Sequence, residues 1–402
     1  MDKYYDIVVV GAGPAGMMAA GAALEMGAKV LLLDKLTLPG KKLLITGHGR
    51  CNITNNKEPR ILSSGYHEAS RFVYPALRRF TPEDCMDFIT GELGLKLKTE
   101  ENDRVFPVSD KASDVRDRMV SYIGRDNILT GFCCASVTAD ENGFTVTSED
   151  GREVTSDSLI LAAGGKSYPM TGSDGSGFAL ASSLGHTIVA PRPALAMIPS
   201  DDEIVTRLSG VTVSDVVLSL FVNGKKTAST SGDLLFTHKG LSGPAAMELA
   251  REIPHCIDGD VHICADFARD VTDQVLLTKM AEHSRSLFVN VTADFVPRSL
   301  AEMICTDTTS KCSDVSASVR KDVLRRLREY RFEITKVPDM ASAYCTRGGV
   351  DLSEIDRKTY GSRIVPNLYI VGENTDVDGI SGGYNLAFAA GSSYLAVSSI
   401  VG

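Results

Sequence analysis

The sequence predicts an α/β fold in which a parallel sheet is built from both ends of the chain and interrupted by an inserted domain. Near the N-terminus, the apolar run 5–10 leads into a glycine-rich turn and a helical stretch of small residues. Near the C-terminus, the apolar run 368–371 is followed by further glycines and a second helical stretch. The 402 residues also exceed what one compact core usually supports, so we expect more than one domain.

The N-terminal run continues into Gly11, Gly13 and Gly16, in the order strand, GxGxxG turn and helix. This arrangement binds a dinucleotide, because the glycines permit the tight turn and the close backbone approach while the helix offers free amides to a pyrophosphate. A second strand, residues 29–33, ends at Asp34, whose carboxylate is placed to accept the hydroxyls of an adenosine ribose. The predicted contacts are Gly11, Gly13, Pro14, Ala15, Gly16, Asp34 and Lys35.

Residues 40–52 are rich in glycine and in cationic side chains, directly after the ribose-binding strand. A loop of this kind suits a long anionic ligand. Nicotinamide dehydrogenases do not usually need one, so the loop favours FAD. The contacts predicted here are Lys42, Leu43, Gly47, Arg50, Cys51 and Asn52.

A β-rich stretch follows, with turn signals at residues 141–143 and 149–151. It leads into a strand at 159–161 that ends in the small residues Ala163, Gly164 and Gly165. We expect these three residues, and Cys134 at the start of the stretch, to lie beside the ligand.

The C-terminal segment predicts a strand, a glycine turn and a terminal helix. Glu373 ends the strand, where it could accept hydrogen bonds from ribityl hydroxyls. A helix starting near Gly383 would direct its free amides at the negative charge of a reduced flavin. The predicted contacts are Gly372, Glu373, Asp378, Gly382, Gly383, Tyr384 and Asn385.

The pattern changes after residues 191–193. Strands are expected at 211–213 and 216–222, with a hairpin turn at Asn223 and Gly224, and helical periodicity runs from about 273 to 330. We therefore place a lid-like domain at 191–343, between two parts of the FAD-binding domain at 1–190 and 344–402, with the substrate cleft at the junction.

Composition limits the possible partners. The formal charge of −9 and the scattered lysines and arginines argue against nucleic acid, and the basic residues near 320–330 fit the solvated face of an amphipathic helix. The nine cysteines show no CxxC pair and no metal-ligand spacing, so we expect reduced thiols and no metal site. No signal-peptide pattern appears, and glycines and serines interrupt the apolar C-terminal stretch. These features predict a cytoplasmic protein without a membrane partner.

Several motifs resemble the BaiN/YhiN (HI0933-like) family of bacterial NAD(P)/FAD-dependent oxidoreductases, also known as aminoacetone oxidases. They include GKKLLITGHGRCNITN, LLFTHKGLSGPA, TRGGVDLSEIDRKT and LYIVGENTDVDGISGGYN, and the similarity covers nearly the whole chain. The resemblance implies tightly bound FAD and a Rossmann-like flavin domain, interrupted by a β-barrel-like segment with a small helical unit. His48 is one departure, because relatives more often have glycine there.

The reaction is narrowed by what the sequence lacks. It contains neither a redox cysteine pair nor a second dinucleotide fingerprint, which excludes a disulfide reductase with two bound dinucleotides. NADH or NADPH would therefore bind only transiently. We rank first an NAD(P)H-dependent reductase of conjugated C=C bonds in a small substrate such as a steroid-like or bile-acid-like enone. The alternatives are an oxygen-dependent amine oxidase of the aminoacetone type and a flavin-dependent RNA-modifying protein.

Catalytic candidates follow from proximity to these motifs. His48 could donate a proton, because the ordinary imidazole pKa lies near neutrality. Tyr168 could act as a phenolic acid, and Arg347 could bind a carboxylate. His238, in the inserted domain, is a weaker candidate.

Overall fold

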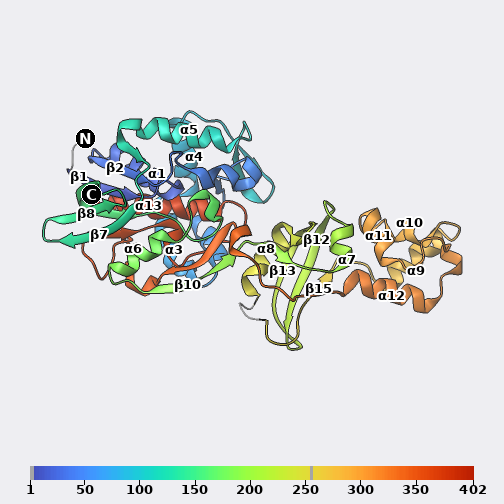
Figure 1. Ribbon diagram of the computed structural model, residues 1–402. Helices are drawn as coiled ribbons and strands as arrows, with labels where there is room; N and C mark the ends of the chain where they lie inside the picture. Colours follow the sequence, from blue (N-terminus) through green and yellow to red (C-terminus); the bar gives the residue numbers. More distant parts are fainter. Residues whose placement is uncertain (1–3, 254–256) are drawn as a thin grey trace. The chain divides into compact units, whose positions relative to one another are not determined.

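The computed structural model describes residues 4–253 and 257–402. The chain divides into two compact units (Figure 1). The first combines Met1–Arg192 with Tyr344–Gly402, and the second is Pro193–Ala343. Each unit has its own hydrophobic core.

A seven-stranded sheet forms the centre of the first unit. Its strands run in the order β6-β2-β1-β9-β8-β7, and β18 also pairs with β9. Five strands are parallel: β1 (Tyr4–Val10), β2 (Val30–Asp34), β6 (Ile128–Thr130), β9 (Glu153–Leu161) and β18 (Leu368–Ile370). An antiparallel hairpin of β7 (Cys134–Asp140) and β8 (Gly143–Ser148) completes the sheet.

Strand β9 explains how the two chain ends meet. Its first half pairs with β8, while Leu159, Ile160 and Leu161 pair with β18 from the C-terminal segment. The parallel strands β1 and β2 are buried, as their continuous apolar sequences require. The prediction of an α/β fold assembled from both ends is confirmed.

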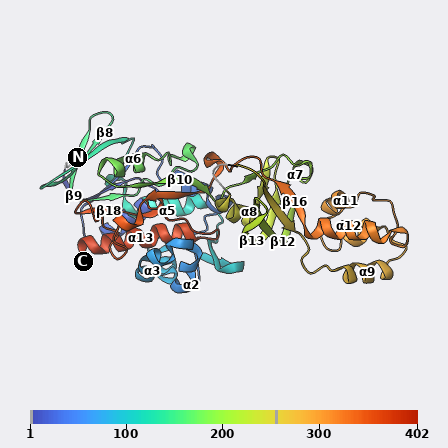
Figure 2. The same ribbon diagram turned by 90° about the horizontal axis from the view of Figure 1, so that it is seen from below.

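Helices pack on this sheet and on each other. Helix α1 packs against both α13 and α5. Helix α3 packs on α13 (Figure 2). The helices of this unit are α1 (Pro14–Glu25), α2 (Pro59–Ser63), α3 (Ser70–Arg79), α4 (Pro82–Gly91), α5 (Ala112–Ile123), α6 (Ser176–Ser183) and α13 (Tyr384–Val401).

Two smaller sheets support the same unit. One contains β3 (Thr54–Asn55), β5 (Arg104–Pro107) and β4 (Leu97–Glu100). The other pairs β10 (Ile188–Ala194) with β17 (Cys345–Val350), which are the segments that enter and leave the insertion.

The second unit contains a curled antiparallel sheet of six strands. In sheet order they are β11 (Ile198–Pro199), β14 (Gly240–Ser242), β13 (Lys225–Phe236), β12 (Thr212–Val222), β15 (Val261–Asp266) and β16 (Tyr330–Glu333). The hairpin turn falls at Asn223 and Gly224, whose φ values are +50° and +75°, as a tight hairpin turn requires. The two strands expected at 211–222 are one strand, interrupted between Val213 and Val216 by a register shift.

The helices of the second unit are α7 (Glu203–Arg207), α8 (Gly243–Leu249), α9 (Asp273–Glu282), α10 (Phe288–Thr292), α11 (Arg298–Ile304) and α12 (Ala317–Arg328). The last four form the expected small helical unit. Among the described residues, none of the helices combines the length and apolar character needed to cross a bilayer.

Candidate functional site

The glycines of the GxGxxG turn have different physical roles. Gly11 has a φ of +104°, and a Cβ there would lie 2.6 Å from the carbonyl oxygen of Ala162. A Cβ on Gly16 would lie only 1.8 Å from the carbonyl oxygen of Gly11. Both positions therefore need glycine so that the turn can pack against the end of β9 and α1 can pack against the turn.

Gly13 has no such internal reason to be glycine. Its backbone is extended, with φ −77° and ψ −176°, which any residue can adopt. A Cβ at Gly13 would meet nothing within 4 Å. Open space at the N-terminus of α1, which is followed at once by Pro14 and Ala15, fits a pyrophosphate that only glycine lets approach.

Asp34 lies at the end of β2, beside this turn. Its carboxylate accepts hydrogen bonds from the amides of Ala12 and Leu36, both at 2.7 Å. Burial raises the pKa of the Asp34 carboxyl, and the two amides offset part of the rise. Each oxygen keeps a lone pair for a ribose hydroxyl. The amide of Phe132 donates to the carbonyl of Asp34, which brings Cys134 near the same strand end.

Two lysines hold the segment after β9. Lys35 Nζ lies 2.6 Å from Asp174 and 3.2 Å from the hydroxyl of Ser176, and Lys41 Nζ donates to the carbonyl of Met170 at 2.8 Å. These cations fasten residues 166–176 against the segment that follows β2. The ribose-side role predicted for Lys35 stays a prediction, since its ammonium is used here within the protein.

A partly buried polar network joins three distant parts of the sequence. Lys42 Nζ lies 2.9 Å and 3.1 Å from the carboxylate oxygens of Glu373 and donates to Ser167 Oγ at 2.8 Å. Glu373 also accepts from the amide of Thr346 at 2.8 Å and from Ser167 Oγ at 3.0 Å. Ser167 and Thr346 are fully buried. The network therefore fixes the predicted ribityl-binding carboxylate in position.

The small residues after β9 fit closely around this network. A Cβ on Gly165 would lie 2.3 Å from Thr346 Oγ1 and 2.8 Å from Glu373 Oε1. The amide of Gly164 donates to Asn374 Oδ1 at 3.0 Å, and Ala163 precedes it at the end of the strand. Gly165 is thus required by the packing of the site.

The turn before α13 is clamped by the segment after Cys51. Asn55 Nδ2 donates to the carbonyl of Gly382 at 3.0 Å, and the side-chain oxygen of Asn52 accepts from the amide of Gly383 at 3.0 Å. A Cβ on Gly383 would lie 2.4 Å from the carbonyl of Thr54. Asn52 therefore acts on the glycine turn, and its predicted contact with flavin is not needed to explain it.

The first turn of α13 is also tied to the loop before it. Asn385 exchanges hydrogen bonds with both backbone groups of Gly379, at 2.9 Å and 3.0 Å. Tyr384 is buried and accepts from the hydroxyl of Tyr66 through its carbonyl at 2.6 Å, while Gly372 and Asp378 are buried nearby in sequence. The carboxyl-terminal motif is thus a rigid element that presents the N-terminus of an 18-residue helix.

Residues 41–49 form a 3-10 segment that is kinked at its end, where Gly47 and His48 have φ values of +56° and +58°. The His48 side chain is exposed. Arg50 pairs with Glu100 and with Asp110, at 2.7 Å for the latter, and these hydrogen bonds raise the pKa of its guanidinium. Burial raises the pKa of the Cys51 thiol to about 12, so Cys51 is not a ready nucleophile.

The other catalytic candidates have partners of their own. Tyr168 has a φ of +51° and packs against Tyr344, with 5.3 Å between the ring centroids. Arg347, on β17, forms an ion pair with Glu68 at 3.1 Å. His238 is an exposed residue of the second unit. Their catalytic roles stay predictions.

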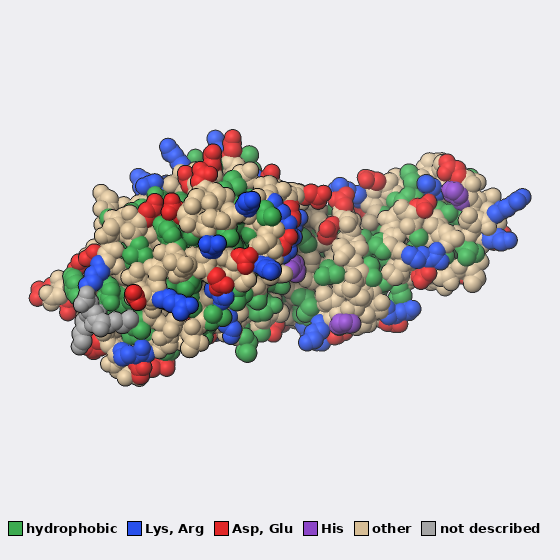
Figure 3. Space-filling model, turned by 90° about the horizontal axis from the view of Figure 1, so that it is seen from above, with side chains coloured by type: hydrophobic (Ala, Val, Ile, Leu, Met, Phe, Trp, Pro, Cys, Tyr) green, Lys and Arg blue, Asp and Glu red, His purple; other side chains and the backbone are tan. Residues whose placement is uncertain are grey.

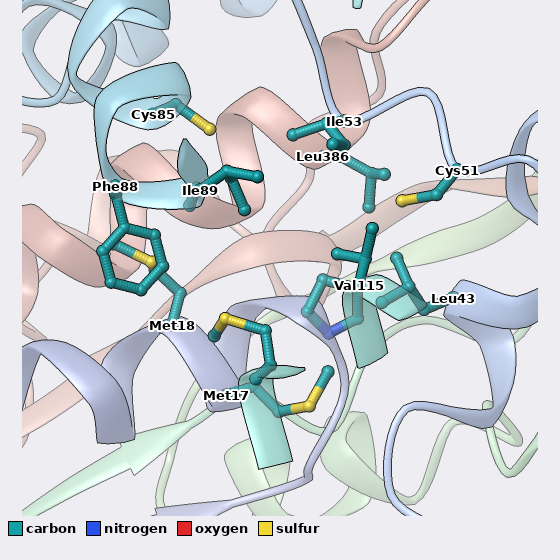
Figure 4. Close-up of a pocket in the computed structure, with 13 residues that line it drawn as sticks. Met17, Met18, Leu43, Cys51, Ile53, Cys85, Phe88, Ile89, Val115 and Leu386 are labelled. Atoms are coloured by element: carbon teal, nitrogen blue, oxygen red, sulfur yellow. The ribbon is translucent and has the colours of Figure 1, made fainter. Parts of the chain in front are cut away.

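An apolar cavity lies behind the glycine turn (Figure 4). Met17 and Met18 of α1, Leu43 and Leu386 contribute to its walls, together with the thiols of Cys51 and Cys85. Leu43 thus lines this cavity, and its predicted contact with the ligand stays a prediction.

The arrangement fits a bound FAD. Open space lies at Gly13, a carboxylate ends β2, and a second carboxylate and a lysine meet beside the N-terminal turn of α13. Sequence reasoning missed Ser167, Thr346, Asn374 and Asn55 as parts of the site. Their only sequence signal was that each lies within three residues of a predicted site residue, since their hydrogen-bond partners are distant along the chain.

A two-ended parallel sheet with this turn and these carboxylates defines an FAD-binding oxidoreductase of the Rossmann type. The model of the HI0933-like protein Rossmann domain matches residues 5–399. The chain therefore belongs to this family.

Two curated relatives match nearly end to end. The 3-dehydro-bile acid delta(4,6)-reductase of Clostridium scindens is 30% identical over 406 residues, which cover 97% of each chain. The ribosomal RNA dihydrouridine synthase of Escherichia coli is 30% identical over 410 residues, covering 99% of this chain and 98% of that protein.

Solved structures agree on the fold. A 3-ketosteroid delta1-dehydrogenase from Sterolibacterium denitrificans is 14% identical with a TM-score of 0.52, and each chain is covered completely. The quinol fumarate reductase subunit FrdA of Escherichia coli gives a TM-score of 0.51 at 15% identity, covering 99% of this chain and 70% of that one.

Proposed function

We propose that this protein reduces a C=C bond conjugated to a carbonyl group in a small steroid-like enone, with NADH or NADPH as a transient electron donor. The observation that carries the proposal is the similarity over nearly the whole chain to the bile-acid reductase, in a protein whose fold also provides a site for FAD. The dihydrouridine synthase supports the same chemistry, because the bond that distinguishes uridine from dihydrouridine is also a C=C conjugated to a carbonyl.

The chemistry that FAD would supply, once NADH or NADPH has reduced it, is a hydride for the carbon at the far end of the conjugated system. The protein's own groups prepare the site. Lys42 holds the Glu373 carboxylate, which would bind ribityl hydroxyls, and the amides of the first turn of α13 would face the negative charge that reduction creates. His48 would give a proton to the carbon next to the carbonyl, so that one hydride and one proton complete the saturated product.

Two half-reactions test the proposal. Anaerobic stopped-flow mixing with NADH or NADPH should bleach the flavin absorbance, and a 3-keto-4-ene steroid should restore it in the absence of oxygen. His48→Ala should slow the second step more than the first. Equal slowing of both steps would remove His48 as the proton source. Reduction of the flavin by an amine, followed by rapid reoxidation by oxygen, would replace this proposal with the amine oxidase alternative.

A second candidate is reduction of a uracil base in ribosomal RNA. It is favoured by two relatives named ribosomal RNA dihydrouridine synthase, from Escherichia coli and from Haemophilus influenzae, the latter 27% identical over 413 residues. Mass spectrometry of ribosomal RNA from a deletion strain, with and without the restored gene, would reveal a missing dihydrouridine. No change in the RNA would reject this candidate.

A further inference from the structure

Most arginines of the inserted unit are neutralised by carboxylates. On α12, Arg320 pairs with Asp273 at 2.8 Å, and Arg325 and Arg326 share Asp322 at 2.7 Å and 2.9 Å. Each of these arginines therefore has a carboxylate beside its guanidinium, although Arg325 and Arg326 share one. On the face shown in Figure 3, basic and acidic side chains are likewise interspersed.

The helices α2 and α3 differ from this pattern. Arg60, Arg71, Arg78 and Arg79 are exposed, and within the described parts of the chain none of them lies in an ion pair with a carboxylate. Four unneutralised arginines on two adjacent short helices are unusual in a chain whose formal charge is −9. We call this surface, together with Tyr74, the α3 arginine face.

Helix geometry places these side chains together. Phe72, Val73, Ala76 and Leu77 are buried against the core. Arg71, Tyr74 and Arg78 are spaced by three and four residues, so they share the opposite side of α3. Tyr74 is 37% exposed, and the guanidinium of Arg79 is held 5.1 Å from the ring centroid of Tyr394.

The α3 arginine face adjoins the predicted flavin end of the site. Between α2 and α3, the carbonyl of Gly65 accepts from the amide of Ile380 at 2.9 Å, and Glu68 pairs with Arg347 at 3.1 Å. Helix α3 packs on α13, as Figure 2 shows. A long ligand bound on this face would therefore lie on the same unit as Arg347 and the turn before α13.

We propose that the α3 arginine face binds the phosphate backbone of single-stranded or looped RNA, with Tyr74 stacking on a base. Arginines without carboxylate partners suit phosphates, and an aromatic ring between two of them suits an unpaired base. The inference rests on the second candidate function, and it names the surface that would hold the RNA.

The test uses the FAD-loaded protein and a fluorescein-labelled 20-nucleotide oligouridylate, with anisotropy measured from 50 to 200 mM KCl. Arg71→Gln/Arg78→Gln should weaken binding about tenfold at low salt and reduce the salt slope by about 1.4, because two phosphate contacts are lost. Arg325→Gln/Arg326→Gln on α12 removes the same charge and should change neither value. Tyr74→Leu should weaken binding by about fivefold or more at every salt concentration.

Each outcome decides the matter. Equal weakening by the α3 and α12 variants would show that only net charge matters and would overturn the inference. Failure of the wild-type protein to bind RNA, with binding to vesicles of phosphatidylglycerol instead, would assign the face to a membrane. FAD content and a cooperative unfolding transition check folding, and Arg60→Gln/Arg79→Gln serves as a second pair if the first does not fold. RNA binding through this face without any reduction of uridine would refute the second candidate function alone.

Discussion

Alanine at Gly13 and at Gly16 should affect different properties of the protein, although both residues belong to one motif. At Gly16 the new Cβ would lie 1.8 Å from the carbonyl oxygen of Gly11, so α1 and the turn must separate. Overpacking of this kind usually costs 1–3 kcal/mol, and a backbone contact this close places the expected loss at about 3 kcal/mol. FAD affinity should fall as a consequence of the displaced turn.

At Gly13 the new Cβ would meet no atom within 4 Å, and the backbone is already in an ordinary conformation. Alanine is a poorer N-cap than glycine by a few tenths to about 1 kcal/mol, while its smaller unfolded-state entropy returns about 0.4–1 kcal/mol. These effects nearly cancel. The apoprotein should therefore keep its stability within about 0.5 kcal/mol, whereas FAD binding should weaken at least tenfold because the methyl group occupies the space of the pyrophosphate.

Urea unfolding of the two apoproteins and fluorescence titration with FAD separate these effects. We expect a lower midpoint for Gly16→Ala only, and weaker FAD binding for both variants. The reasoning would be refuted if Gly13→Ala destabilised the apoprotein as much as Gly16→Ala, or if it bound FAD with unchanged affinity.

Three further predictions concern the partly buried network, the thiols and the chain end. Lys42→Met and Glu373→Gln should each weaken FAD binding. A double-mutant cycle on the free energy of unfolding should show a coupling of about 1–2 kcal/mol between the two side chains, whereas additive losses of stability would show that they do not interact. Because burial raises the pKa of Cys51 and of Cys85 to about 12, only about one thiol in ten thousand is ionised at pH 8. Cys133 is only half-buried, so iodoacetamide should modify it before Cys51 and Cys85, and mass spectrometry showing equal rates would contradict this. A chain ending at Val371 lacks α13 and should not hold FAD, provided that a cooperative unfolding transition shows that it still folds.

The sequence predicted well the parts of the fold that are specified locally. The strand, glycine turn and helix at residues 5–25 depend on neighbouring residues, and so does the hairpin turn at Asn223 and Gly224. The strands at 159–161 and 368–371 were also predicted, as parts of one domain built from both chain ends, and the structure adds that they pair with each other. Local pattern and ligand chemistry agreed at these points.

Long-range polar contacts were not predictable. Lys42 and Glu373 are far apart in the sequence, and nothing in either motif shows that their side chains pair. Asn52 was expected to touch flavin because it follows a glycine-rich loop, and that contact stays a prediction. The structure adds a role that the motif did not indicate, since the side-chain oxygen of Asn52 accepts from the amide of Gly383. A motif therefore identifies the region of a site more securely than it identifies which side chains face the ligand.

Net charge leaves the question of a nucleic-acid partner open for a related reason. Salt screens exposed charges beyond about 10 Å at ordinary ionic strength, so a ligand at one surface responds mainly to the groups near it. In the structure, many of the arginines face carboxylates, whereas the four on α2 and α3 are exposed and, among the described residues, have no such ion pair. Helical spacing alone cannot make this distinction. On α12, Asp322 lies beside both Arg325 and Arg326. On α3, the residue between Arg71 and Arg78 is Tyr74, which carries no charge to offset theirs. Whether this flavoprotein binds RNA therefore depends on how charges are paired locally at one surface, rather than on the net charge of the chain.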